Sequence, residues 1–349
     1  MVSAQIASIA AALPAPVDQR ALWHECFEAR YREVRGARRI WASAGVVTRH
    51  AVMDPRVEDV SQWSTGTRMQ RYVAEAVPLA KQAVQSALEE AHLRAEDVDF
   101  LAVVSCTGYA APGLDLMLAR DLAMAPTVER LVIGHMGCYG AFPGLRAAAD
   151  AVVARQATAV LLCTELSSLH LQPASRDLDQ LVANALFSDA AVAVVVRGSA
   201  HGLRLIDITA VTDSVHIDAM TWRVTDLGFR MGLSPRVPEL LARQVRPAVE
   251  ALLQRHHVAL SDVGGWAIHP GGPSILRACA TALGLDDTAL APSRDVLREH
   301  GNCSSATVLL VLDRLRHEGR VKAGDPIVAM AFGPGLTLYA ALLRADDSC

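Results

Sequence analysis

The segment IGHMGCYGAFPGLRAAAD, residues 133–150, has the pattern of a strand that passes through a tight turn into a helix. Three glycines and Pro143 suit such a turn and the first turn of a helix. Cys138 stands at the turn, beside the positive end of the expected helix dipole, which favours a thiolate over a thiol. A small buried cysteine would fit the same turn, so this segment alone leaves a packing residue and a nucleophile open.

Around this segment, short β-branched runs alternate with amphipathic stretches. In the first part of the chain the expected strands are 99–106, 130–135, 158–165 and 191–197, all buried, and the expected helices are 74–92, 144–155 and 177–186. In the second part, apolar runs at 203–211, 264–270 and 326–343 alternate with helical patterns at 238–256, 273–283 and 304–318. This alternation favours a mostly parallel sheet that helices cover on both faces.

The second half repeats the rhythm of the first, and no low-complexity linker divides them. The turn-rich stretch RGSAHG at 197–202 marks the junction. We therefore expect a duplicated α/β chain of two layered halves, residues 1–200 with Cys138 and residues 201–349 with His269 and Asn302. The Arg-rich stretch within residues 20–72 is read as a solvated helical face or an anion-binding surface.

Composition excludes several classes of function. The 349 residues are 52% hydrophobic and carry a formal net charge of −4, which argues against nucleic acid as the main partner. No run of about 18 apolar residues occurs and the start of the chain has no basic segment, so we expect no membrane span, no signal peptide and a cytoplasmic protein. The seven cysteines are scattered without CxxC pairs, so we expect reduced thiols and no metal site.

Two further segments place polar side chains at the ends of secondary-structure elements. WAIHPGGPSIL, 266–276, puts His269 at the end of an apolar strand, as a base, an oxyanion donor or a structural histidine. EHGNCSSATVLLVLDRL, 299–315, puts Asn302 before a helix, where a capping role is the alternative. A Cys–His pair can form an activated thiolate, and His with Asn supplies two N–H donors for an oxyanion. No carboxylate stands in these motifs to act as a hydrolytic base.

Several motifs together resemble the type III polyketide synthases, the chalcone-synthase-like branch of the thiolase superfamily. The resemblance covers nearly the whole chain. It rests on LFSDAAVAVVV (186–196), SPRVPELLARQV (234–245), HPGGPSIL (269–276), GNCSSATVLLVLD (301–313) and AFGPGLTLYAALLR (331–344). This similarity implies a thiolase-like duplicated αβαβα layered fold, with thiolase-like halves at residues 1–200 and 201–349. It also implies a homodimer, in which Ala111 matches the position that reaches across the interface.

The resemblance also implies roles for individual residues. Cys138 matches the nucleophile, and His269 and Asn302 match the other two catalytic residues. Phe187 matches the gate between the coenzyme A tunnel and the internal cavity, and Met231 stands where an aromatic second gate residue is usual. The positions that match the cavity wall and its floor loop are Cys106, Thr107, His170, Ser304, Gly333, Pro334 and Gly335. The candidates for coenzyme A contacts are Arg38, Arg39, Arg49 and Ser274.

The implied activity is that of an acyltransferase. It would condense malonyl-CoA iteratively and with decarboxylation onto a Cys-bound starter from a starter acyl-CoA, then cyclise the chain to a resorcinol-like aromatic or a pyrone. Coenzyme A thioesters are the substrates, and no metal or redox cofactor is expected. An inward-facing His170 would favour a short or malonyl-derived starter, whereas a His170 satisfied by backbone groups would not. The alternatives are a single-condensation ketoacyl synthase and an inactive acyl-CoA-binding scaffold.

Overall fold

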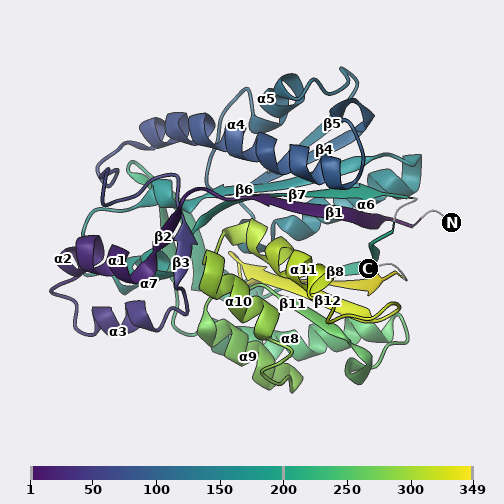
Figure 1. The fold of residues 1–349 in the computed structure, drawn as a ribbon. Helices are drawn as coiled ribbons and strands as arrows, with labels where there is room; N and C mark the ends of the chain where they lie inside the picture. Colours follow the sequence, from purple (N-terminus) through teal and green to yellow (C-terminus); the bar gives the residue numbers. More distant parts are fainter. Residues whose placement is uncertain (1–2, 199–200, 347–349) are drawn as a thin grey trace.

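The computed structural model describes residues 3–198 and 201–346, in which one mixed sheet runs through the whole molecule (Figure 1). Its strands are β1 (Gln5–Ala12), β4 (Phe100–Ser105), β5 (Glu129–Gly134), β6 (Ala159–Leu166), β7 (Asp189–Arg197), β8 (Leu203–Thr212), β11 (Gly265–Ile268), β12 (Pro326–Gly333) and β13 (Thr337–Ala345). They lie in the order β11-β12-β13-β8-β1-β7-β6-β4-β5. Two small sheets pair β2 (Pro16–Asp18) with β3 (Thr48–His50) and β9 (Met220–Thr225) with β10 (Gly228–Leu233).

The strand directions reveal the duplication. In the first half β1, β7 and β6 are antiparallel neighbours, and β6, β4 and β5 are parallel. In the second half β8, β13 and β12 are antiparallel neighbours, and β12 and β11 are parallel. A short ladder between β1 and β8 joins the two sets of strands, Gln5 with Arg204 and Ile6 with Leu203. Each half thus repeats one pattern of directions, with one strand fewer in the second.

The prediction of a mostly parallel sheet is wrong. The segment 326–343, expected as one run, is the hairpin β12–β13, and a connection of three residues joins only antiparallel strands. The predicted buried strand at 130–135 is also different, because β5 lies at the edge of the sheet and is largely exposed. The division at residue 200 stays a prediction, since residues 199–200 lie outside the described part of the chain, as does Cys349.

Helices cover the outer faces of the two halves of the sheet, and two further helices lie between these halves. They are α1 (Gln19–Leu22), α2 (Glu28–Arg30), α3 (Ala37–Ala42), α4 (Thr65–Glu90), α5 (Leu114–Asp121), α6 (Ala141–Arg155), α7 (Leu178–Leu186), α8 (Val237–Gln254), α9 (Pro273–Leu283), α10 (Ala291–His300) and α11 (Thr307–His317). Helix α4 begins nine residues before its predicted start, because Ser64 caps it by accepting from the Thr67 N–H at 3.2 Å.

Three apolar cores define the layers. Alternate residues of β7 face opposite sides: Val192 and Val194 join the core of α6 and α11, while Ala193 and Val195 join the core under α4. Helices α8 and α9 cover the outer face of β12 and β13 with the third core. The order is therefore helix, sheet, helices, sheet, helices (Figure 1), which confirms the duplicated layered α/β fold.

The short helices α1–α3 form an addition to this frame beside α7 (Figure 1). Their aromatic side chains pack together, with the Trp41 ring 5.4 Å from that of Trp23 and 4.6 Å from that of Phe27. None of the helices in the described residues is long and apolar enough to cross a membrane.

Candidate active site

Cys138 lies between β5 and α6, in a single 3₁₀ turn over Gly137–Tyr139. Gly137 has a φ of +72°, and a Cβ there would lie 2.5 Å from Cδ of Pro334, so the turn needs glycine. The strand–turn–helix prediction for this segment is confirmed, and the thiol is buried with 7% of its residue surface exposed.

His269 and Asn302 come from the second half of the chain. His269 follows β11, its backbone N–H donates to the Met330 carbonyl at 2.8 Å, and neither ring nitrogen has a partner among the described residues. Asn302 stands between α10 and the turn at Ser304–Ala306, and its Oδ1 accepts the Ser304 N–H at 2.9 Å. Since that bond fixes the oxygen of the amide, the Asn302 Nδ2 is a donor with no partner among the described residues.

The side chains of Cys138, His269 and Asn302 converge on one cavity of about 550 Å³. Its walls also come from α3, α7, α8 and α9, and include Phe187, Met231 and Ser274. The two sequence halves therefore meet at a single space in which a thiol, an imidazole and an amide face the same volume.

Phe187 and Met231 occupy the junction of this cavity with a smaller one. An inner pocket of about 20 Å³ shares Cys138, Phe187, Met220 and Met231 with the large cavity. Its remaining wall includes Cys106, Thr107, Trp222, Ser304 and Pro334. The positions expected to form a gate thus stand where two spaces meet. Of the positions expected to line the inner space, Cys106, Thr107, Ser304 and Pro334 do so.

A buried carboxyl group lies behind the inner pocket. Glu165, on β6, accepts from the Thr107 hydroxyl at 2.8 Å, from the Ser305 hydroxyl at 2.5 Å and from the Cys106 N–H at 3.0 Å. Ser304 Oγ lies 3.3 Å from Cys106 Sγ. Burial raises the pKa of Glu165, and the three donors oppose this shift. The network fixes the side chains that form the inner wall.

The electrostatics of the resting site differ from the sequence prediction. Burial, reinforced by the Glu165 charge, raises the pKa of Cys138 to about 12, whereas the helix dipole predicted a lowered value. Burial lowers the pKa of His269 to about 3. No hydrogen bond joins the two among the described residues, so this structure lacks the contact of the predicted thiolate–imidazolium pair, and burial favours the neutral form of each group.

His170 does not line either space. Its Nε2 lies 2.6 Å from the Thr107 carbonyl, and its Nδ1 accepts the Phe229 N–H at 3.0 Å. The ring stacks on Phe229 with 4.4 Å between centroids and meets the Trp222 edge at 5.5 Å. The prediction of an inward-facing histidine is wrong, because two backbone groups use both ring nitrogens, and the starter preference drawn from it loses its basis.

The prediction that Arg49 contacts coenzyme A does not fit its position in the structure. It is buried and donates to the carbonyls of Asn184 at 2.7 Å, Ala185 at 2.8 Å and Phe187 at 2.9 Å, and burial lowers its pKa to about 10. Its guanidinium braces the end of α7 and has no free face for a phosphate. Such a buried arginine looks the same in sequence as an exposed one.

The mouth of the large cavity carries other cations. Ser274 and Arg277, on the first turns of α9, line it, and Arg277 is exposed with no carboxylate partner among the described residues. Arg38 and Arg39 are exposed on α3, whose residues Ile40 and Ser43 line the same mouth. Sequence analysis missed Arg277, although its place one turn after the HPGG loop could have indicated it.

The loop 333–335 contributes one wall residue. Pro334 lines the inner pocket, Gly333 lies against the Tyr139 ring, and Gly335 turns the hairpin with a φ of +74°. Met220 and Trp222, on β9, were also missed, because the edge of a small sheet carries no motif. The Trp222 Nε1 donates to the Cys106 carbonyl at 2.8 Å and holds this ring in the wall.

Comparison with known proteins agrees with this geometry. Residues 38–200 match the N-terminal domain of chalcone and stilbene synthases, and residues 211–346 match their C-terminal domain. A 1,3,6,8-tetrahydroxynaphthalene synthase of Streptomyces peucetius is 37% identical over 88% of this chain and 83% of that protein. A polyketide synthase-like protein of α-pyrone synthesis from Mycobacterium tuberculosis is 31% identical over 86% of this chain and 80% of its own.

Solved structures give the same result. The 1,3,6,8-tetrahydroxynaphthalene synthase of Streptomyces coelicolor, a bacterial type III polyketide synthase, superposes with a TM-score of 0.93 at 30% identity, over 98% of this chain and 99% of that one. A polyketide synthase of the brown alga Ectocarpus siliculosus reaches 0.91 at 28% identity, over 99% of both chains. The chain belongs to the chalcone and stilbene synthase family and is a type III polyketide synthase.

Proposed function

We propose that Cys138, His269 and Asn302 carry the condensation in this protein. The observation that supports the proposal is their convergence, from both halves of the chain, on one cavity of about 550 Å³. The Cys138 sulfur attacks the carbonyl of an acyl-CoA, the coenzyme A thiolate leaves, and the acyl group stays on the enzyme as a thioester. Because burial favours the neutral form of both groups, His269 takes the thiol proton as the sulfur attacks and returns it to the leaving thiolate.

The next step is the loss of CO₂ from malonyl-CoA. The C–C bond to the carboxylate breaks, and its electron pair forms the enolate of the thioester. His269 offers one ring N–H and Asn302 its free Nδ2–H to the developing oxyanion, since neither is engaged by another group of the described chain. The enolate carbon then attacks the acyl-Cys138 carbonyl and releases the sulfur, which leaves a β-ketoacyl-CoA for the next cycle.

The coenzyme A part of each substrate lies at the mouth of the large cavity in this proposal. Arg277 and Ser274 line that mouth, and Arg38 and Arg39 flank it on α3. Exposed guanidinium groups without carboxylate partners suit phosphate oxygens. The reaction uses coenzyme A thioesters and, as we propose, no metal or redox cofactor.

The product is a small aromatic, resorcinol-like compound or a pyrone. What supports this is that Trp222, held by the Cys106 carbonyl, and the Glu165 network behind the inner pocket limit the room for a long chain beside Cys138. The names of two relatives, which describe tetrahydroxynaphthalene and α-pyrone synthesis, concern products of these two types.

The protein acts as a homodimer in this proposal. Strand β5 has a partner on only one side among the described strands, and Leu131 and Val132 are 38% and 56% exposed on it. Tyr109 and Ala111 are exposed near the end of the neighbouring β4. An exposed apolar edge strand is a site where a second copy of a chain pairs. We also place the protein in the cytoplasm, where its thiols stay reduced.

The experiment is incubation with malonyl-CoA alone and then with a panel of acyl-CoAs, with products and protein adducts followed by mass spectrometry. Cys138→Ala should abolish the acyl adduct and the polyketide, and Asn302→Ala should lower malonyl-CoA decarboxylation by about 10²–10³-fold. Cys279→Ala, which removes a buried thiol of α9 outside both cavities, is the matched control. A product of one condensation would indicate a ketoacyl synthase. A wild-type protein that forms no acyl adduct would indicate an inactive scaffold.

A further inference from the structure

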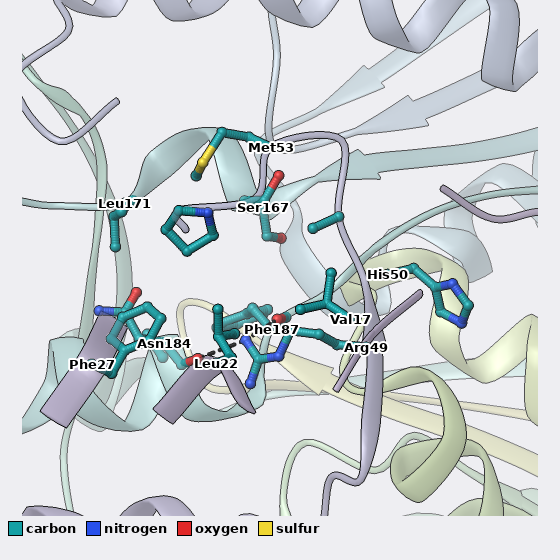
Figure 2. A pocket seen from close by; sticks show the side chains of 14 residues that line it. Val17, Leu22, Phe27, Arg49, His50, Met53, Ser167, Leu171, Asn184 and Phe187 are labelled. Carbon is teal, nitrogen blue, oxygen red and sulfur yellow. Dashed lines mark hydrogen bonds between the residues drawn. The ribbon is translucent and has the colours of Figure 1, made fainter. Parts of the chain in front are cut away.

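A third pocket borders Phe187, and its lining residues do not include Cys138, His269 or Asn302 (Figure 2). It has a volume of about 50 Å³ and shares Phe187 and Ala183 with the large cavity, and Phe187 and Ser167 with the inner pocket. We call it the side pocket. Since Phe187 borders all three spaces, it is the partition between the side pocket and the space that Cys138 faces.

The wall of the side pocket is apolar. Figure 2 shows the side chains of Leu22, Phe27, Met53 and Leu171 around it, from the N-terminal addition and the segment after β6. The volume of about 50 Å³ holds about two methyl or methylene groups, if each takes the roughly 30 Å³ of a liquid water molecule. An aliphatic chain end fits this space, and a bulky ring does not.

Most polar groups in the wall are already engaged. Arg49 donates to three carbonyls of the α7 end. His50 Nδ1 lies 2.9 Å from the Pro14 carbonyl, and Asn184 Nδ2 donates to the Tyr31 hydroxyl at 2.8 Å. Among the described polar side-chain groups of this wall, the Ser167 hydroxyl, at the border with the inner pocket, and the Asn184 Oδ1 have no hydrogen-bond partner. A polar ligand group would therefore find no free side-chain donor deeper in the side pocket than Ser167 among the described residues.

Phe187 has a fixed backbone and a ring with space around it. Its N–H donates to the Ala183 carbonyl at 2.9 Å, and its carbonyl accepts from Arg49 Nη1 at 2.9 Å. The ring meets Trp222 only at 6.3 Å between centroids and borders an empty volume on each of three sides. Rotation about the side-chain bonds of Phe187 thus joins the side pocket to the reaction cavity without backbone movement.

We propose that the side pocket binds the terminal carbons of a short aliphatic acyl starter held on Cys138, and that Phe187 turns aside to admit them. This proposal rests on the acyl transfer proposed above. The starter is then an aliphatic acyl-CoA whose last carbons, about two of them, lie beyond Phe187, and the length of the chain that fits is a property of the side pocket. Malonyl extension continues in the cavity on the other side of the ring.

Two opposite substitutions test the side pocket. Ala51→Val adds two carbons to its wall and fills it, whereas Met53→Ala enlarges it; neither residue borders the reaction cavity. Met124→Ala is the matched control, since this methionine is buried and lies outside the three pockets. Acetyl-, butanoyl-, hexanoyl- and octanoyl-CoA compete for Cys138 without malonyl-CoA, and the adducts are quantified by intact-protein mass spectrometry.

The side pocket predicts a shift in the ratio of adducts. Ala51→Val should lower hexanoyl relative to acetyl loading by about tenfold, and Met53→Ala should raise octanoyl relative to butanoyl loading by about tenfold. Should Met53→Ala fail to fold, Ala51→Val decides alone. Unchanged ratios, or an equal loss for every acyl-CoA in Ala51→Val, would overturn the side pocket while the acyl transfer stands. A wild-type protein that forms no adduct would overturn both proposals.

Discussion

Phe187 and Asn302 lie side by side as the two members of a parallel β-bridge that joins the halves of the chain. The Ser188 N–H donates to the Asn302 carbonyl at 2.9 Å, and the Asn302 N–H donates to the Leu186 carbonyl at 2.8 Å. The residue that separates the cavities is thus fixed to the residue proposed to hold the oxyanion. Any shift of one backbone segment displaces the other.

Gly301→Ala tests this coupling. Gly301 has a φ of +71°, and a Cβ there would lie 2.9 Å from Cβ of Ser188 and 3.0 Å from the Leu186 carbonyl. We expect the bridge to be pushed apart, with kcat lowered by about tenfold or more and a loss of about 1–3 kcal/mol in the free energy of unfolding. Steady-state kinetics and urea denaturation measure the two effects.

Gly319→Ala is the control for backbone strain alone. Gly319 has a φ of +61°, and a Cβ there would meet no atom within 4 Å. It should lose about 1 kcal/mol of stability and leave kcat unchanged. Equal kcat values for the two variants would show that the bridge does not position Asn302.

Features that depend on neighbouring residues in the chain could be predicted from the sequence. Each catalytic candidate stands within a motif at an element end, and the helix 273–283 begins and ends as its Pro and Gly predict. The direction of a strand relative to its neighbours depends on which strands pair in the sheet. The sequence patterns of β6, β7, β11 and β12 do not show this pairing. The antiparallel neighbours of β1, β7 and β13 therefore could not be predicted from periodicity.

Trp222→Ala should enlarge the inner pocket. The indole fills one wall there and donates to the Cys106 carbonyl, so its removal opens a volume larger than the present 20 Å³. We expect longer polyketides and bulkier starters among the products, together with a stability loss of about 3–5 kcal/mol. Product profiles by liquid chromatography and mass spectrometry give the answer, and an unchanged profile in a folded variant would remove Trp222 as the size-limiting wall.

His170 makes stability depend on acid. Burial lowers the pKa of His170 from 6.5 to about 4, and the positive charge of Arg68 lowers it further. A second ring proton would also point at the Phe229 N–H. Below pH 6.5 this histidine binds a proton in the unfolded chain but not in the folded protein. The contribution of His170 to the free energy of unfolding is therefore fully present above pH 6.5 and is lost as the pH drops toward 4. At pH 5 the loss from this group is on the order of 2 kcal/mol.

The non-titrating variant His170→Gln should flatten this dependence. The measured quantity is the difference in free energy of unfolding between pH 7.5 and pH 5 from urea denaturation. It should shrink by on the order of 2 kcal/mol in His170→Gln and stay at the wild-type value in His24→Gln, whose imidazole is exposed. Identical pH differences in all three proteins would contradict a neutral, buried His170.

Val132→Lys tests pairing of two copies through β5. A lysine on this exposed edge strand places two like charges against each other in a dimer, and lysine on strand edges opposes pairing. We expect a monomer by sedimentation velocity for this variant and a dimer for the wild type. Val153→Lys, at a valine with 53% exposure on α6 compared with 56% for Val132, should leave the mass unchanged. A dimeric Val132→Lys would place the interface elsewhere.

The burial of individual arginine and histidine side chains could not be predicted from the sequence. Arg49 lies in the Arg-rich N-terminal stretch and Arg277 directly follows the HPGGPSIL motif. Arg49 is buried against carbonyls of α7, whereas Arg277 is exposed at the cavity mouth and has no carboxylate partner among the described residues. His170 likewise occupies a position that the family resemblance places on the cavity wall, and a backbone N–H and a carbonyl hold it behind that wall. Burial depends on elements distant in sequence, here the N-terminal addition and the β9–β10 hairpin.

Arg277→Ala should weaken the binding of coenzyme A thioesters while leaving the chemistry intact. The guanidinium lies at the mouth, far enough along α9 to be exposed, and has no carboxylate partner among the described residues. We expect the KM for malonyl-CoA to rise about tenfold with little change in kcat, and the effect to shrink at high salt, since charge-assisted contacts are screened. A malonyl thioester of N-acetylcysteamine, which lacks phosphates, should show the same KM in both proteins. Arg243→Ala, at an arginine of α8 paired with Glu239, is the control. If the KM for the truncated thioester rises as much as that for malonyl-CoA, Arg277 shapes the mouth without binding phosphate.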